Sequence, residues 1–304
     1  MVINQSLPYN FGFTDYVDNG GKLVSSGYEL AADANFKFEA VKLVLDATIT
    51  YQNSKIKSLE LINSDTEFLL RDAPSAQYII SVDNPVNAFY GYKTNGIYSS
   101  APSSKIIGPN GRPMDAGDVI FEDVDNNGII DDNDKQIIGD PNPDLFGSVN
   151  AVLSYNRFEF STLFTYNVGN DIYNYVKYQS TAMDSYANQS IDVLDRWQPS
   201  NPNAEFPKAT FGDPKGNNVF SDRWIEDGSY LRLKQLTISY TIPGIYKFKK
   251  ETKFYITGTN LLTLTKYSGY DPEMMYQSDP FYMGIDYGKI PHARSIIVGI
   301  QISL

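Results

Sequence analysis

The sequence predicts an all-β fold, in which about seven long antiparallel strands form part of a transmembrane β-barrel. Three observations support this prediction. Polar and apolar side chains alternate with a period of two residues along several segments, and the connections between these segments alternate between short and long. The chain is also rich in aromatic residues, with 23 Tyr and 17 Phe, and tyrosine favours membrane interfaces. The absence of any run of about 18 apolar residues excludes a transmembrane helix.

The alternation is clearest between residues 158 and 166. The even positions are mostly aromatic and the odd positions mostly polar, and the even set reads Phe158, Phe160, Thr162, Phe164 and Tyr166. Residues 236–242 and 296–304 repeat the scheme. Because successive side chains of a strand point to opposite faces, this pattern indicates strands whose two faces meet different solvents.

Seven strands are therefore expected, at residues 23–34, 36–53, 145–156, 157–168, 228–243, 252–265 and 292–304. Short turns are expected near Asn35, near Asn156 and from Pro243 to Thr252, and long connections at about 54–144, 169–227 and 266–291. Short turns at one rim and long loops at the other are typical of bacterial outer-membrane barrels, in which the long loops are extracellular. Seven strands alone would leave two open edges in lipid, so other polypeptide has to complete the wall.

Composition limits the function. The chain has 25 Lys and Arg against 36 Asp and Glu, a net charge of −11, which argues against binding nucleic acid. It has no cysteine, which excludes disulfides and thiolate metal sites, and the single histidine, His292, is interpreted as an ordinary residue at a strand end. No phosphate-binding glycine loop, nucleophile elbow or distinct carboxylate pair is present, so we expect no enzymatic activity and no organic cofactor.

One acidic segment, residues 123–134, has the spacing of a calcium-binding loop. Gly128 stands at position 6, where such a loop turns sharply, and the final position holds an aspartate instead of the glutamate of sensor proteins. We therefore predict a structural Ca²⁺, and the alternative is a metal-free acidic turn. The expected ligands are the side chains or, at position 7, the backbone carbonyl of Asp123, Asp125, Asn127, Ile129, Asp131 and Asp134.

Many aromatic residues fall in the long connections. Exposed rings near Asp and Asn suit stacking and hydrogen bonding of sugars or peptide side chains, whereas the alternative is that they pack the loops on one another. The candidate substrate contacts are Tyr90, Tyr92, Trp197, Trp224 and Tyr270. At the other end of the chain, Gly299–Leu304 is similar to the signal that barrel assembly machinery reads.

Several strings of the sequence together resemble SusC/RagA-family TonB-linked outer-membrane proteins, from about Gly20 to Leu304. The run Gly117–Asp123 into the calcium-like loop, followed by Ile138–Asp144, looks like a hallmark of that family, and the other strings are Gly27–Leu30, Phe89–Gly96, Arg196–Pro202, Ile225–Lys234 and Tyr267–Glu273. The strings are specific together and not singly. The match is to the C-terminal portion of such a protein, so residues 1–304 are expected to lack the plug domain and the signal peptide. We expect a fragment or the product of a split gene.

The resemblance implies a 22-stranded barrel in the outer membrane, in contact with its lipid. It further implies a SusD-like lipoprotein that covers the barrel, a glycan or peptide substrate held between the two, and TonB acting through the plug. An alternative from the residues alone is a secreted, calcium-stabilised β-sandwich that binds carbohydrate. Solubility without detergent would distinguish the sandwich from the barrel.

Overall fold

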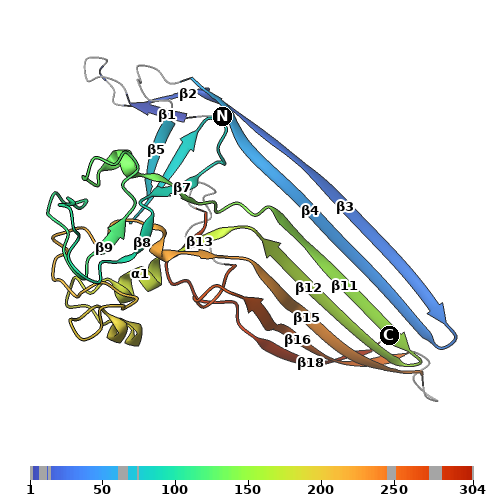
Figure 1. Cartoon of the computed structure of the whole chain (residues 1–304). Helices are drawn as coiled ribbons and strands as arrows, with labels where there is room; N and C mark the ends of the chain where they lie inside the picture. The colour runs from blue at the N-terminus through green and yellow to red at the C-terminus, as the bar shows by residue number, and fades with distance from the viewer. Residues whose placement is uncertain are drawn as a thin grey trace.

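The computed structural model of the chain describes residues 3–6, 12, 15–60, 68–73, 75–244, 251–273 and 283–302. Its main feature is one seven-stranded antiparallel sheet in the order β18-β16-β15-β12-β11-β4-β3 (Figure 1). The bounds of its strands are β3 Gly21–Phe38, β4 Val41–Leu59, β11 Leu145–Tyr155, β12 Phe158–Val168, β15 Tyr230–Ile242, β16 Thr252–Thr265 and β18 Ser295–Ile302. All seven predicted strands, and the all-β antiparallel class, are therefore confirmed.

One predicted turn is wrong. The turn expected near Asn35 lies instead at Glu39 and Ala40, because β3 continues to Phe38 and Asn35 pairs with Val44 of β4. Phe36 pairs with Leu43 and Phe38 with Val41, and this pairing keeps β3 extended. It outweighs the preference of asparagine for turns. The turn near Asn156 is confirmed, with Asn156 in the left-handed region at φ 52°. The third predicted short connection includes residues 245–250, outside the described part of the chain.

The register of the sheet puts apolar side chains from all seven strands on the same face. One row of directly opposed residues runs through Phe36, Leu43, Leu153, Phe160, Ile238, Ile256 and Val298. The next row, nearer the short turns, runs through Phe38, Val41, Tyr155, Phe158, Tyr240, Phe254 and Ile300. Many of these side chains are exposed, up to 76% for Val298. The face is thus apolar and uncovered.

The opposite face of the sheet is polar, and its side chains pair with one another across the strands. Asn150 donates to Asp46 at 2.9 Å, and Lys253 forms an ion pair with Glu159 at 2.8 Å. Hydroxyl pairs at 2.7–2.9 Å join Thr48 to Ser148, Thr237 to Thr257 and Thr259 to Ser295. The two faces of the sheet therefore suit two different solvents, as the alternation predicts.

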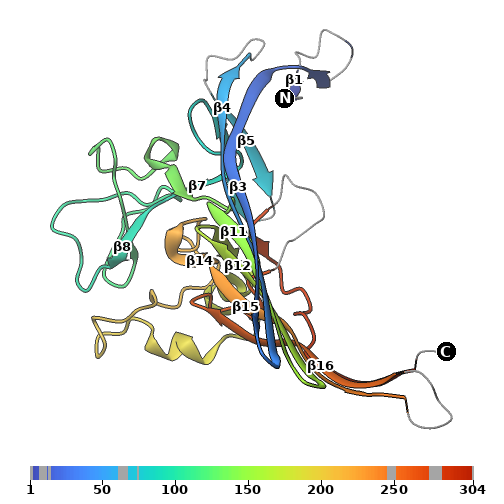
Figure 2. The same ribbon diagram turned by 90° about the vertical axis from the view of Figure 1, so that its right-hand side faces the viewer.

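The short turns lie at one end of the sheet and the long connections gather at the other end (Figure 1). Figure 2 shows the connections projecting to one side of the sheet. They contain their own small sheets, formed by β5 Phe68–Ala73, β6 Ala76–Ser81, β7 Ala88–Gly91 and β10 Gln136–Gly139, by β8 Thr94–Ile97 and β9 Val119–Phe121, and by β13 Asp171–Asn174, β14 Ile225–Asp227 and β17 Ile285–Asp286. Near the N-terminus, β1 Ile3–Ser6 pairs with β2 Asp15–Asp18.

The buried core of the described residues sits in these connections and not in the large sheet. We call this part of the molecule the loop body (residues 68–144, 169–229 and 266–291, where described). One cluster contains Tyr78, Phe89, Tyr173, Trp224 and Ile285, each no more than 1% exposed. The helices are also here: α1 Tyr175–Thr181 and the short 3-10 helices η2 Asp132–Asp134, η3 Ile191–Asp195 and η4 Asp222–Trp224. None of the described helices has the length and hydropathy that a bilayer crossing needs.

Gly147 of β11 provides a stability prediction. The Tyr166 hydroxyl of β12 reaches across Gly147 and donates to the Thr48 carbonyl of β4 at 3.0 Å. A Cβ at position 147 would collide with both the Tyr166 hydroxyl and that carbonyl oxygen. We expect Gly147→Val to lower the free energy of unfolding by about 1–3 kcal/mol, measured by denaturant unfolding of the detergent-purified protein.

Ala47→Val is the matched control, because Ala47 is exposed on the same apolar face. Equal unfolding midpoints for the two variants would contradict the role assigned to Gly147.

Candidate functional site

The calcium-like loop folds so that its carboxylates converge. Ligand oxygens of Asp123, Asp125 and Asp134 all lie within 4.8 Å of one another. The backbone amides of Asn127 and Gly128 donate to Asp123 at 3.1 and 2.8 Å, and Gly128 has φ 80°, a conformation that favours glycine. The sequence spacing thus brings the first, third and twelfth positions of the loop together.

The other predicted ligands lie in the same turn with different contacts. Asn127 accepts from the amide of Ile129 at 2.6 Å and donates to Asp125 at 2.8 Å. Asp131 caps η2 and accepts from the amide of Asn133 at 2.8 Å. Ile129 is 46% exposed, whereas the next residue, Ile130, is buried in the loop body.

Asp134 is the unusual member of the group, because its side chain is fully buried. Its two oxygens accept hydrogen bonds from the amides of Val124 and Asp131 at 2.7 and 2.8 Å. Within the described residues, no lysine or arginine forms an ion pair with Asp123, Asp125 or Asp134. Carboxylates taken out of water without a neutralising charge are costly, so the arrangement favours a bound cation.

A second buried carboxylate joins two of the long connections. Asp118 is fully buried and forms ion pairs with Lys208 at 3.1 Å and Lys215 at 2.9 Å, while Asn217 donates to it at 3.0 Å. Burial opposes ionisation of Asp118, but the hydrogen bonds from Lys215, Asn217 and Lys208 outweigh burial and hold its pKa below the ordinary value. Asp118 therefore ties the connection 54–144 to the connection 169–227.

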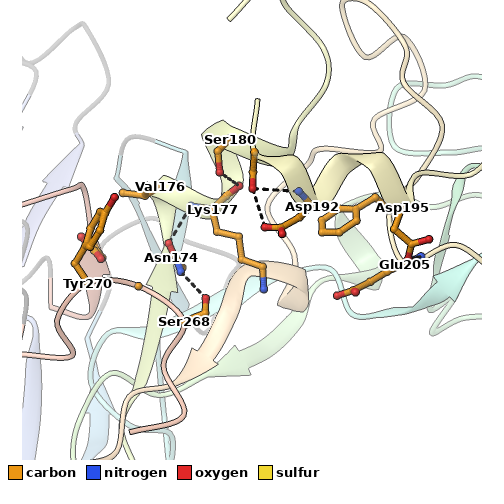
Figure 3. Close-up of a pocket in the computed structure, with 13 residues that line it drawn as sticks. Asn174, Val176, Lys177, Ser180, Asp192, Asp195, Glu205, Ser268 and Tyr270 are labelled. Atoms are coloured by element: carbon orange, nitrogen blue, oxygen red, sulfur yellow. Dashed lines mark hydrogen bonds between the residues drawn. The ribbon is translucent and has the colours of Figure 1, made fainter. Parts of the chain in front are cut away.

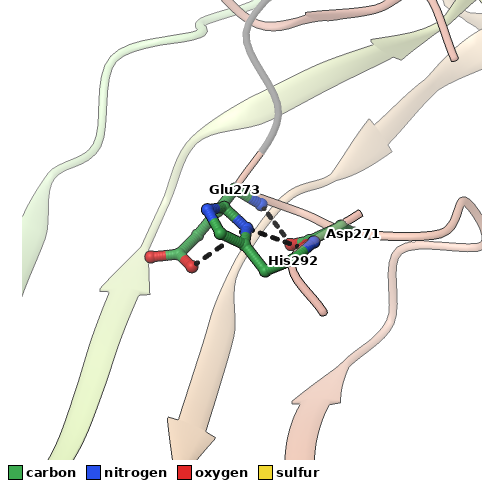
Figure 4. A group of neighbouring side chains, drawn as sticks. All are labelled: Asp271, Glu273 and His292. Atoms are coloured by element: carbon green, nitrogen blue, oxygen red, sulfur yellow. Dashed lines mark hydrogen bonds and ion pairs between the residues drawn. The ribbon is translucent and has the colours of Figure 1, made fainter. Parts of the chain in front are cut away.

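A third polar cluster lies where the loop body meets the sheet. Arg232 of β15 is 2% exposed and binds the carboxylates of Asp271 and Glu273. His292, just before β18, closes the cluster, since its ring lies 2.9 Å from Asp271 and its backbone amide donates to the same carboxylate at 3.0 Å (Figure 4). Lys234 pairs with Glu273 at 3.1 Å. We call these five residues the Arg232 cluster.

The Arg232 cluster carries its own positive charge. Burial opposes ionisation of Asp271, but hydrogen bonds from Arg232, His292 and the Glu273 amide outweigh it and place the pKa of Asp271 well below its ordinary value. Although two carboxylates meet here, the guanidinium of Arg232 and the ammonium of Lys234 already neutralise them. The cluster therefore acts as a structural tie that pins the connection 266–291 to β15.

A cavity with a volume of about 620 Å³ lies on the loop body. Residues of α1, η3 and the turn 267–270 surround it (Figure 3). Asp195 and Glu205 lie beside each other at one end of this view and Tyr270 lies at the other. A cavity of this size is within the range of small-ligand sites.

Comparisons with known proteins agree with this architecture. No protein-family model matches the chain. TonB-dependent receptor P3 of Formosa agariphila is 28% identical over 315 residues, which cover 99% of this chain and 31% of the relative. TonB-dependent receptor SusC of Bacteroides thetaiotaomicron is 27% identical over 217 residues, which cover 70% of this chain and 20% of SusC. The chain is homologous to SusC-type TonB-dependent receptors. It spans less than a third of the length of these relatives.

The fold of the chain is also found in solved structures of a peptide transporter. The RagAB peptide transporter matches with a TM-score of 0.76 and 20% identity, covering 99% of this chain and 32% of the matched chain. The RagAB peptide importer in an open-open state gives a TM-score of 0.77 over the whole chain. TonB-dependent receptors are outer-membrane proteins, so the predicted family resemblance and outer-membrane location are confirmed.

The five residues predicted to contact substrate differ in how exposed they are. Trp224 is 1% exposed and Tyr92 is 7% exposed, and both rings pack inside the loop body. Tyr90 is half-buried beside Phe68, with ring centroids 6.3 Å apart. Trp197 is half-buried and packs directly on Gly117. Tyr270, in contrast, is 79% exposed at the rim of the cavity.

The sequence did not reveal the other residues that line this cavity or those of the Arg232 cluster. Lys177, Asp192 and Glu205 come from separate segments of an acidic chain, and no local motif relates them. The string Ile225–Lys234 carries the family resemblance and contains Arg232, but nothing in it shows that Arg232 meets Asp271. Only the tertiary structure assembles these sites.

Asp118 provides a prediction on pH. Because its native pKa is lowered from the unfolded value near 4, its contribution to stability is present above about pH 4 and is lost as the pH falls towards the native pKa. We expect Asp118→Asn to cost about 3 kcal/mol at neutral pH, because Lys208 and Lys215 lose their buried partner, and much less at acid pH.

Both tryptophans lie in the loop body, so their fluorescence during denaturant unfolding measures its stability. Asp115→Asn is the control, since the Asp115 side chain is exposed and bonds only to the neighbouring Ala116 amide. A stability difference between wild type and Asp118→Asn that does not change with pH would contradict the ion-pair role.

Proposed function

We propose that the chain is part of the wall and outer mouth of an outer-membrane importer of large nutrients. The observation that supports this most directly is the two-faced sheet, in which every strand contributes to uncovered apolar rows on one face and to hydrogen-bonded polar pairs on the other. Lipid on the first side and water on the second would satisfy both faces.

The height of the apolar band fits an outer membrane. On β12, Tyr166 lies eight residues after Phe158, which is about 26 Å of strand and about 20 Å of height at a tilt of about 40°. Aromatic residues mark both ends of this band, as they do at membrane interfaces. They are Tyr155, Phe158 and Tyr240 near the short turns, and Tyr28, Tyr51 and Tyr166 near the loop body.

The two edge strands of the sheet would need further strands as hydrogen-bonding partners. In the described part of the chain, β3 and β18 each pair on one side only. Unpaired backbone groups in lipid cost several kcal/mol each, so the remaining two-thirds of a receptor-sized protein would close the wall. In this proposal the complete wall has 22 strands and surrounds a plug, as in other large outer-membrane transporters.

The partners follow from the position of the loop body at the outer mouth. A SusD-like lipoprotein would cover it, a glycan or peptide would be held between the two proteins, and TonB would draw on the plug to admit the cargo. Similarity to SusC and to the RagAB peptide transporter supports this arrangement. In this role the chain binds and guides cargo without changing it chemically.

The structure disfavours the alternative of a secreted β-sandwich. A sandwich buries the apolar face of one sheet against a second sheet. Here the described residues place no second layer over that face, and Ile238, Ile256 and Ile300 remain 45–60% exposed.

Lipid contact can be tested with a tryptophan on each face of β15. Ile238 belongs to the apolar face and Thr237 to the polar face. We expect Ile238→Trp fluorescence to be quenched by lipids brominated in their acyl chains, after subtraction of the wild-type signal, and Thr237→Trp fluorescence to be unaffected. Equal quenching of the two variants in reconstituted liposomes would refute the membrane wall.

We further propose that Ca²⁺ binds in the loop 123–134 and stabilises the loop body. The convergence of Asp123, Asp125 and Asp134, the burial of Asp134 and the lack of a neighbouring lysine or arginine within the described residues support this proposal. Asn127 and Asp131 supply further oxygens in the same turn, and the backbone carbonyl of position 7 would complete a set typical of calcium. Aspartate at position 12 suits a structural ion.

Calorimetry tests the calcium proposal. We expect a Ca²⁺ binding isotherm for the wild-type protein and none for the double variant Asp123→Ala with Asp125→Ala, because two carboxylate ligands are removed. Ca²⁺ should also slow proteolysis of the connection 54–144 in the wild type only. Asp132→Ala is the control, since this exposed carboxylate pairs with Lys135 at 2.8 Å instead of facing the cluster. If the wild-type protein gives no Ca²⁺ isotherm, the loop is a metal-free acidic turn and the calcium proposal is wrong.

A further inference from the structure

Several hydrogen-bond donors in the lining of the cavity are already engaged. Ser190 donates to Asp192 at 2.8 Å, and Ser268 donates to Glu226 at 2.8 Å. The Lys177 ammonium also binds Glu226, at 3.0 Å. The one lysine of the cavity therefore has its charge neutralised by a carboxylate of the protein.

The acceptors of the cavity are in surplus. Asp192, Asp195 and Glu205 are exposed, and no described lysine or arginine forms an ion pair with any of them. Asp195 accepts from the Asn201 side chain and from the Glu205 amide, at 2.8 and 3.2 Å. Because an ionised carboxylate offers about four acceptor positions, each retains capacity for a ligand. The cavity is therefore rich in acceptors and negatively charged.

This inventory distinguishes between the two classes of cargo. A sugar hydroxyl both donates and accepts hydrogen bonds but carries no charge, so it cannot neutralise the surplus carboxylates. An ammonium or guanidinium group only donates and carries a positive charge, which matches the surplus carboxylates.

Apolar groups at the rim complete the site. The ring of Tyr270 is 79% exposed and offers a face for a cation or a planar guanidinium. On η3, Ile191 and Leu194 are 78% and 67% exposed, on the helix that also contributes Asp192 and Asp195. Such neighbours suit the apolar side chains of a peptide next to its charged group.

We infer that this cavity binds a positively charged group of a peptide, either a lysine or arginine side chain or the amino terminus. The inference rests on the proposed role in nutrient import and chooses peptide over glycan as the cargo at this site. Asp192, Asp195 and Glu205 accept the hydrogen bonds of the bound group, and Tyr270, at the other end of the cavity, contacts another part of the peptide.

Three pentapeptides of alternating alanine and lysine, glutamine or glutamate test the class of ligand. With the detergent-purified protein, we expect the lysine peptide to bind about tenfold or more tightly than the glutamine peptide, and the glutamate peptide to bind weakest. Affinity for the lysine peptide should fall as salt is raised. Equal affinities for the three peptides, or competition by the neutral sugar cellopentaose, would overturn the inference.

Two pairs of variants test the location. Asp192→Asn with Glu205→Gln should weaken lysine-peptide binding about tenfold, whereas Asp72→Asn with Asp83→Asn removes the same charge outside the cavity and should leave binding unchanged. Tyr270→Ala should also weaken binding, and Tyr186→Ala, which removes another exposed tyrosine outside the cavity lining, should not.

Circular dichroism verifies that each variant is folded. Equal effects of the cavity variants and their controls would place the site elsewhere. The lipid-quenching experiment separates this result from the proposed function: quenching at position 238 without charge-selective peptide binding would overturn only the peptide site.

Discussion

The structure depends on the register of its antiparallel strands. Side chains of a strand alternate between faces, so a slip of one residue in any pair would move that strand's apolar residues to the polar side. The observed register instead aligns Leu153, Phe160 and Ile238 in one row and keeps Asp46 opposite Asn150 on the other face. The apolar residues of each strand thus align with those of its neighbours on one face of the sheet.

Register also explains why Arg232 can be buried. On the C-terminal side of the bulge at Lys234, the residues of β15 on the apolar face are even-numbered, such as Ile238. On its N-terminal side they are odd-numbered, such as Leu231. The bulge shifts the phase by one residue and therefore points Arg232 inward, to Asp271 and Glu273. A regular strand would have placed this guanidinium on the apolar face of the sheet.

The sequence predicts the features of this molecule that depend on residues close together in the chain, and not those that depend on contacts between distant segments. Alternation of polar and apolar side chains is a local pattern, so the seven strands and the two different faces of residues 158–166 could be predicted. The spacing of residues 123–134 is also local, and it predicted that the carboxylates of this loop would lie close together. The turn at Asn35 was not, because pairing with β4 extends β3 to Phe38. Nor could composition separate the buried Trp224 from the exposed Tyr270, since both lie in long connections and burial depends on distant segments.

The loop body combines firmly held backbone segments with exposed side chains. Asp271 is 3% exposed and held by Arg232, while the residue before it, Tyr270, is 79% exposed beside the cavity. An aromatic side chain anchored through its neighbour has little conformational freedom to lose, and in the proposed peptide site pre-organisation of this kind would raise affinity without adding contacts. Asp118 joins the connection 54–144 to the connection 169–227, and Arg232 joins the connection 266–291 to β15. Residues far apart in the sequence therefore line one cavity.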